Sequence, residues 1–156
     1  MSDKLTHLNE RGEAHIVDIG GKQITHRRAV ARAVLEAEPA TVAAIAGGTL
    51  KKGDALAVAR VAGIMAAKKT SDLIPLCHPI ALSKVEVDIV AAGNTLTITA
   101  TAETTDRTGV EMEAMTAASV AALTLYDMAK GIDRLMRVTT IELVEKSGGK
   151  SGDFRR

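Results

Sequence analysis

The sequence predicts an α+β fold: a ferredoxin-like antiparallel sheet packed against two long helices. Three observations support this prediction. Apolar and polar residues alternate over residues 80–90 and again over 96–102, with Gly93 and Asn94 between them, as in a β-hairpin. Segments with helical periodicity precede and follow this hairpin. A further alternating run covers residues 135–144 and predicts a last strand.

The N-terminal part of the chain gives weaker signals. Residues 1–14 are polar and are expected to be mobile, and residues 15–19 alternate weakly, as in a short strand ended by two glycines. Residues 25–38 are ambiguous. Their many Ala and Arg residues favour a helix, whereas a two-residue alternation, Ile24 to Arg28 and Val30 to Val34, fits a strand. Propensity alone predicts a helix here.

Two helices are predicted before the hairpin. Residues 39–46 form a short one, with Pro39 at its first position and Gly47-Gly48 after it. Asp54 is a good N-cap for a second, which begins at Ala55, carries an apolar stripe and ends near two lysines. The PLCHP segment that follows, residues 75–79, is predicted to be a stiff loop between two prolines.

The most distinctive stretch is the Ala-rich helix predicted over residues 108–131. Thr108 or Asp106 could cap it, and Gly131 could end it. Glu113 and Asp127 share one face roughly, but they are about 21 Å apart along the axis. Two carboxylates at that separation cannot act on one reacting atom. If both function, either the ligand is long or each end serves a different site between subunits.

The order of elements suggests one domain of 156 residues. If residues 25–38 are a strand, the order becomes β-α-β-β-α-β, the ferredoxin-like arrangement. One face of the sheet would then lack a helix cover, and oligomerisation is one way to hide it. The tail, residues 147–156, is Gly-rich and basic and is expected to be mobile.

Composition excludes several classes of function. A net charge of +1, with one Tyr, one Phe and no Trp, argues against nucleic-acid binding and membrane-surface binding. No apolar run is long enough to span a bilayer, and the N-terminus has no apolar signal region. The single cysteine, Cys77, cannot form an internal disulfide, which favours a reducing compartment. We therefore expect a cytoplasmic protein.

Several side chains could carry chemistry. His78 is presented by the stiff loop, and we assign its neighbour Cys77 a packing or positioning role. Asp127 and Lys130 lie on adjacent turns, as an acid/base pair or as an ordinary surface ion pair. The lysines beside loop signals could form an anionic pocket, such as one for a polyphosphate, or could be solvated surface charges. The four histidines and Cys77 show no metal-ligand spacing.

The tail segment EKSGGKSG invites comparison with the P-loop, but it fails because Val144 occupies the first required Gly position and no helix follows. A lid that brings lysines onto a phosphate remains an alternative to a disordered tail.

Three motifs together resemble one family: LIPLCHP at residues 73–79, GVEMEA at 109–114 and LYDMAK at 125–130. With KKGD at 51–54 and KSGGKSGDF at 146–154, the chain resembles, over nearly its whole length, the MoaC family of cyclic pyranopterin monophosphate synthases in molybdenum cofactor biosynthesis. The resemblance implies a lyase that rearranges 3′,8-cyclo-7,8-dihydro-GTP, made by a radical SAM GTP cyclase, and releases diphosphate. It also implies a ferredoxin-like fold, so that residues 25–38 become a strand, and a homohexamer, a trimer of dimers, with sites at subunit interfaces.

The resemblance also implies roles for particular residues. Asp127 would be the general acid/base residue and Lys130 its partner. The residues expected to contact the substrate or its phosphates are Leu76, Cys77, His78, Glu111, Met112, Glu113, Lys52, Lys68, Lys146 and Lys150, of which the last two would belong to a lid. No cofactor is required because no step is a net oxidation, although Mg²⁺ could accompany the triphosphate. A non-catalytic oligomeric module that binds a purine nucleotide or polyphosphate is the alternative function.

Overall fold

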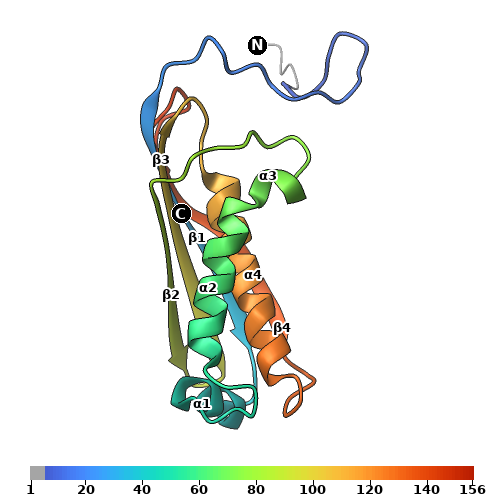
Figure 1. Ribbon diagram of the computed structural model, residues 1–156, viewed down its shortest axis with the longest axis vertical. Helices are drawn as coiled ribbons and strands as arrows, with labels where there is room; N and C mark the ends of the chain where they lie inside the picture. Colours follow the sequence, from blue (N-terminus) through green and yellow to red (C-terminus); the bar gives the residue numbers. More distant parts are fainter. Residues whose placement is uncertain (1–5) are drawn as a thin grey trace.

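The computed structural model describes residues 6–156 and shows one sheet with helices beside it (Figure 1). The predicted mobility of residues 1–14 falls partly outside the described residues. In chain order the elements are β1 (Thr25–Glu36), α1 (Pro39–Gly47), α2 (Ala55–Lys68), α3 (Thr70–Leu73), β2 (Lys84–Ala92), β3 (Thr95–Asp106), α4 (Glu111–Ala129), β4 (Arg137–Ser147) and β5 (Phe154–Arg155). The predicted α+β class is confirmed.

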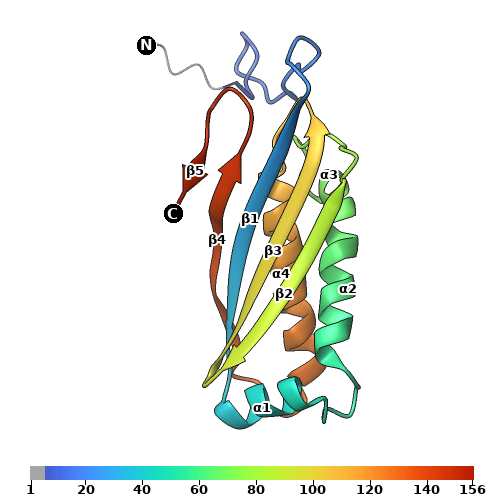
Figure 2. The ribbon, with the colours of Figure 1, turned by 90° about the vertical axis from the view of Figure 1, so that its left-hand side faces the viewer.

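The sheet has the strand order β2-β3-β1-β4-β5, and every neighbouring pair is antiparallel. The long helices α2 and α4 lie side by side on one face, and α1 lies across one end (Figure 2). With the helices α1 to α3 counted as one helical connection, β1 to β4 follow the order β-α-β-β-α-β. No helix among residues 6–156 combines the length and the apolar character that a membrane span needs.

Strand β1 corrects the helix that propensity predicts for residues 25–38. It lies between β3, which pairs with its whole length, and β4, which pairs with it from Arg28 to Glu36. Ala29, Ala31, Ala33 and Leu35 are fully buried and alternate along it, as one face of a strand must. Long-range pairing and burial of this alternating face therefore override the helical propensity of Ala and Arg.

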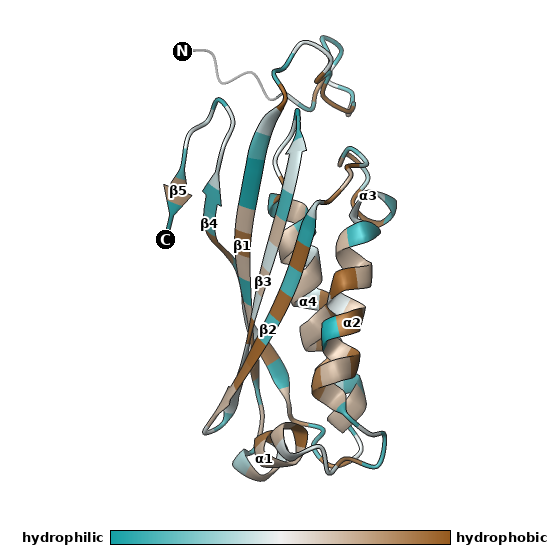
Figure 3. Cartoon of the chain, turned by 60° about the vertical axis from the view of Figure 1, so that its left-hand side comes forward, coloured by the Kyte–Doolittle hydropathy of each residue, from teal (hydrophilic) through white to brown (hydrophobic). Residues whose placement is uncertain are grey.

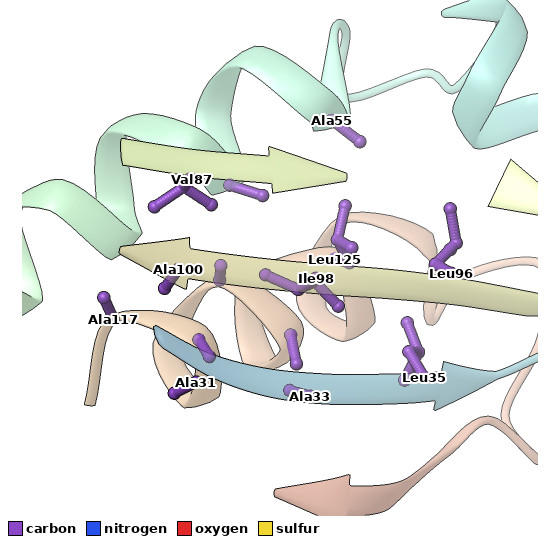
Figure 4. Packing of buried hydrophobic residues seen from close by; sticks show 14 of the residues in the cluster. Ala31, Ala33, Leu35, Ala55, Val87, Leu96, Ile98, Ala100, Ala117 and Leu125 are labelled. Carbon is purple, nitrogen blue, oxygen red and sulfur yellow. The ribbon is translucent and has the colours of Figure 1, made fainter. Parts of the chain in front are cut away.

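The core lies between the sheet and the two long helices, and its helical side is made largely of alanine. Ala117, Ala121 and Leu125 of α4 are fully buried against residues such as Ile98 and Ala100 of β3 (Figure 4). Small side chains let α4 approach the sheet and α2 closely. The approach is close at Gly63 of α2, where an added Cβ would lie 2.9 Å from the carbonyl oxygen of Ala117.

Gly63→Ala is therefore expected to destabilise the protein, although Ala has the higher helix propensity. The new methyl group would meet the Ala117 backbone at 2.9 Å and a Val87 methyl at 3.1 Å, so the helices must separate. We expect a loss of about 1–3 kcal/mol in the free energy of unfolding, measured by urea denaturation. Gly131→Ala is a suitable control, because a Cβ there meets no atom within 4 Å. An equally stable Gly63→Ala variant would contradict the close packing.

Local signals place several elements where the sequence predicts them. The Asp54 side chain accepts a hydrogen bond of 3.1 Å from the Ala57 amide and caps α2. Gly48 ends α1 with φ of 68°, and Gly93 turns the β2–β3 hairpin with φ of 59°. These residues confirm the predicted helices, turn and hairpin.

Two local predictions are wrong. Residues 15–19 form no strand, because this segment lies beyond the end of the sheet and the Val17 carbonyl accepts a hydrogen bond from His78 instead. Helix α4 begins at Glu111 without a side-chain cap. The Asp106 carboxylate accepts the Arg107 amide at 2.6 Å, so it does not cap the helix. At the other end, Lys130 is the C-cap residue and Gly131 follows it at the predicted position, without the positive φ that many glycines adopt there.

The outer surface carries two features. The face of the sheet without helices is polar: Arg28 pairs with Glu145, and Arg32 pairs with Glu142. By contrast, apolar side chains are exposed along α2, visible as brown segments in Figure 3. The large ones on this helix are Val58, Val61 and Met65.

Candidate active site

Helix α4 carries a separate group of polar side chains at each end. At its N-terminal end is a cavity of about 170 Å³. The PLCHP loop, the start of α4 and the N-terminal segment supply its lining residues, which are His7, Leu76, Cys77, His78, Thr108, Gly109, Glu111, Met112 and Glu113. The cavity therefore unites all six residues that the sequence predicts from the LCHP and VEME motifs.

Hydrogen bonds hold the PLCHP loop to the residues just before it and to the N-terminal segment. The Cys77 amide donates to the Ile74 carbonyl at 3.1 Å, which forms a turn after α3. His78 Nε2 lies 2.6 Å from the Val17 carbonyl oxygen. A carbonyl can only accept, so this nitrogen carries a proton. The contact also ties the N-terminal segment to the loop beside the cavity.

Glu113 is the most unusual ionisable group of this cavity. Glu113 is only 4% exposed. Burial raises its pKa to about 7, its own backbone amide opposes the shift, and the nearby Glu111 carboxylate adds to it. Burial also raises the pKa of the Cys77 thiol, and the two glutamates raise it further. Cys77 is therefore held as a neutral thiol rather than as a nucleophilic thiolate.

Glu111 links the cavity to the C-terminal tail. Lys146, at the end of β4, lies 3.0 Å from the Glu111 carboxylate and also donates to the Ser151 hydroxyl at 2.9 Å. Gly109 leaves room for this arrangement, because a Cβ there would overlap the Glu111 carboxylate. The first turn of α4 thus positions two carboxyl groups, of which Glu111 is paired with Lys146.

The raised pKa of Glu113 predicts a pH-dependent effect of Glu113→Gln on stability. Between pH 4.5 and about 7 the folded protein holds a proton that the unfolded chain has lost, so wild-type stability falls as pH rises. Gln cannot ionise, so the variant does not lose stability in this way as pH rises. Relative to wild type, the variant should gain on the order of 1–3 kcal/mol in unfolding free energy between pH 5 and pH 8. Urea denaturation at both pH values measures it. If the difference in unfolding free energy between the variant and wild type does not change with pH, the raised pKa does not belong to Glu113.

At the C-terminal end of α4, Asp127 is surrounded by lysines. Lys130 Nζ lies 2.8 Å from one carboxylate oxygen. Lys52 Nζ donates to the Asp127 main-chain carbonyl at 2.9 Å and lies 3.5 Å from the other carboxylate oxygen. The hydrogen bond from Lys130 lowers the pKa of Asp127, and the charges of both lysines lower it further. The same bond raises the pKa of Lys130. The pair is therefore held as carboxylate and ammonium at neutral pH.

A basic cavity of about 320 Å³ lies where the tail passes β1. Its lining residues are Lys22, Gln23, Thr25, Arg27, Gly149, Lys150 and Ser151. The sequence prediction includes Lys150 but misses Arg27 and Lys22. The alternation of β1 could identify Arg27. It lies two residues before Ala29, so in a strand it belongs to the same face as the buried alanines. That signal depends on assigning residues 25–36 to a strand.

Known proteins resemble the chain over almost its full length. The sequence model of the MoaC family matches residues 16–149. The chain belongs to the MoaC family. It is 57% identical over 155 residues to the cyclic pyranopterin monophosphate synthase of Thermomicrobium roseum, covering 98% of this chain and 93% of that one. It is 58% identical over 156 residues to that of Roseiflexus sp., covering 99% and 98%. The Brucella ovis protein of the same name is 55% identical, covering 99% and 94%.

The MoaC-family residues named from the sequence do not all meet within one chain. Asp127, Lys130 and Lys52 form one group, and the Glu113 cavity with Lys146 forms another, about 21 Å away along α4. Lys150 lines the basic cavity, and Lys68 is exposed at the end of α2 and lines none of the cavities described above. Among residues 6–156, no three His, Cys, Asp or Glu side chains are grouped to hold a metal ion.

Proposed function

We propose that this MoaC-family protein is a lyase that converts 3′,8-cyclo-7,8-dihydro-GTP to cyclic pyranopterin monophosphate and releases diphosphate, an early step of molybdenum cofactor biosynthesis. The observation that carries the proposal is the 55–58% identity, over nearly the full length, to proteins named cyclic pyranopterin monophosphate synthase. The chemistry of the two groups on α4 supports it.

The Asp127 group supplies acid and base. Opening the five-membered ring of the guanine base and forming the pyran ring both require proton transfers. Asp127 is ionised and can accept a proton, while Lys130, 2.8 Å away, is protonated and can donate one. Lys52 fixes the end of the helix by bonding the Asp127 main chain. Asp127 and Lys130 can thus accept and donate a proton at the same place, which Lys52 helps to hold in position.

The basic side chains suit the phosphates. Attack on the α-phosphate and departure of diphosphate require neutralisation of negative charge. Arg27, Lys22 and Lys150 line a cavity without a carboxylate, and Lys146 stands at the start of the same tail. We assign the triphosphate to these residues, with the tail as a lid. Mg²⁺ could accompany the triphosphate as part of the substrate.

The separation of the two groups on α4 supports an assembly with shared sites. A substrate bound in the Glu113 cavity of one chain is out of reach of Asp127 on the same helix. We propose a homohexamer, a trimer of dimers in the cytoplasm, in which each site takes the Asp127 group from one subunit and the Glu113 cavity from its neighbour. A radical SAM GTP cyclase would supply the substrate.

Diphosphate release separates this enzyme from a nucleotide-binding module. The purified protein, given 3′,8-cyclo-7,8-dihydro-GTP, should release one diphosphate for each cyclic pyranopterin monophosphate formed. Product is identified by mass spectrometry and diphosphate by a coupled assay. Binding of the compound without any diphosphate release would overturn the enzyme assignment in favour of the binding module.

A further inference from the structure

We propose that Arg107 is a further phosphate-binding residue, which contacts the α-phosphate of the substrate between the Glu113 cavity and the basic cavity. This inference rests on the proposed function, because it places the base of the substrate in the first cavity and the triphosphate in the second. Arg107 belongs to none of the motifs or lysine-bearing segments described above.

The Arg107 side chain carries a donor that the fold leaves without an acceptor. Its Nε atom is fully buried, and among the side chains of residues 6–156 that are not exposed it is the only buried nitrogen or oxygen without a hydrogen-bond partner. The hydrogen bonds of this residue are made by its main chain: the amide donates to the Asp106 carboxylate, and the carbonyl accepts from Arg27. A buried N–H group without an acceptor is costly and uncommon in folded proteins. A ligand can therefore supply the acceptor.

A second arginine without a carboxylate partner lies beside it. Arg27 donates through Nη2 to the Arg107 carbonyl at 3.3 Å and through Nε to the Thr25 hydroxyl at 2.8 Å. The adjacent carboxylate in the chain, that of Asp106, accepts the Arg107 amide at 2.6 Å. Neither arginine forms an ion pair within the part of the chain that the structure describes. Two neighbouring cations without a counter-charge favour a bound anion, and the planar N–H fork of arginine matches a phosphate.

The position of Arg107 selects the α-phosphate. Strand β3 ends at Asp106, which pairs with Thr25 at the start of β1, and Thr25 lines the basic cavity (Figure 2). Directly after Arg107, Thr108 lines the cavity at the start of α4. Arg107 thus lies between the two cavities. In a nucleoside triphosphate the α-phosphate is the one nearest the base, so a substrate that spans both cavities brings this phosphate to Arg107.

Binding of the phosphate requires little rearrangement. The Nε group has no hydrogen bond that must break, and the residue is only half-buried, so its side chain can turn toward a ligand. Phosphate oxygens then accept from Nε and from a terminal nitrogen at once. No covalent bond of the ligand changes in this step.

The test compares GMP, which carries the α-phosphate, with guanosine, which lacks it. Arg107→Met removes the guanidinium and keeps an unbranched side chain, and calorimetric titration measures the affinity for each ligand. The preference for GMP over guanosine should be at least about tenfold smaller in the variant than in wild type, because a hydrogen bond to a charged group is lost. Affinity for guanosine should not change. Arg107→Lys, which keeps the charge but not the fork, should restore part of the preference.

Arg137→Met is the matched control. Arg137 pairs with Glu36 at the opposite end of β1 from the basic cavity, so this variant should keep the wild-type preference for GMP. Thermal melting separates phosphate binding from a structural role. Because Nε has no partner in the free protein, Arg107→Met should melt at or above the wild-type temperature without ligand.

A GMP preference that is the same in wild type and Arg107→Met would overturn the inference, as would a wild type that binds GMP no more tightly than guanosine. A lower melting temperature together with equal weakening of both ligands would show a structural role and overturn it too. Diphosphate release from 3′,8-cyclo-7,8-dihydro-GTP tests the proposed function separately. A wild type that releases diphosphate, with a GMP preference that does not depend on Arg107, would leave the proposed function standing and remove this contact.

Discussion

Asp127→Asn is expected to lower kcat by about 10²–10⁴-fold while substrate binding and assembly persist. Asn has the same shape and still offers an oxygen to Lys130 and Lys52, which lie 2.8 and 3.5 Å from the native carboxylate. It cannot accept a proton, and it removes the negative charge that raises the pKa of Lys130. The side chain is exposed, so the fold should not depend on it.

Turnover of the variant is measured by diphosphate release. Binding of the substrate to the variant is measured by calorimetry. Asp54→Asn is the matched control, because Asn caps a helix as well as Asp does and Asp54 bonds only the start of α2. That control should turn over at close to the wild-type rate. Near-normal turnover by Asp127→Asn would remove Asp127 from its acid/base role.

Gly148→Ala is expected to raise KM at least about tenfold, because it displaces the lysine-bearing tail from the phosphate cavity. Gly148 has φ of 90°, and a Cβ there would overlap the carbonyl oxygen of His26. His26 belongs to β1 and is held in register with Thr105, so the tail must move instead. Its movement carries away Gly149, which packs on the Arg27 guanidinium, and Lys150.

The control for this variant is Gly152→Ala. Gly152 also has positive φ, 74°, but a Cβ there meets no atom within 4 Å. It should change KM much less. Thermal melting should be nearly unchanged in both variants, because residues 151–156 are exposed and the main core lies between the helices and the sheet. A Gly148→Ala variant with wild-type KM would show that the tail does not hold the substrate.

The sequence predicts the parts of the fold that local chemistry determines. Asp54, Gly48 and Gly93 act within a few residues of their own positions, and the elements they bound are found as predicted. Strand β1 is different. Its Ala and Arg residues favour a helix locally, and its partners in β3 and β4 are far along the chain. The two-residue alternation of this segment fits a strand, but only the resemblance to the MoaC family decides between strand and helix in advance.

The site residues also divide into contacts that a local sequence pattern predicts and contacts that only the fold creates. The Asp127–Lys130 contact follows from a three-residue spacing on one helix and is visible in the sequence. The approach of Lys52 to Asp127 joins residues 75 positions apart, and no local pattern reveals it. The raised pKa of Glu113 depends on burial beneath other elements. Arg27 has no local signal of its own, because its place in the basic cavity follows only from the register of β1.

The most direct test of the account is activity in mixed assemblies of two inactive variants. Asp127→Asn and Glu113→Ala damage opposite ends of α4, which the account assigns to sites shared between neighbouring subunits. The two proteins, differently tagged, are unfolded and refolded together, and assemblies that carry both tags are isolated. Among randomly assorted pairs, about a quarter of sites should combine an intact Asp127 group with an intact Glu113 cavity, and diphosphate release should recover to that extent. Mixed assemblies as inactive as their parents would contradict a site built from two subunits.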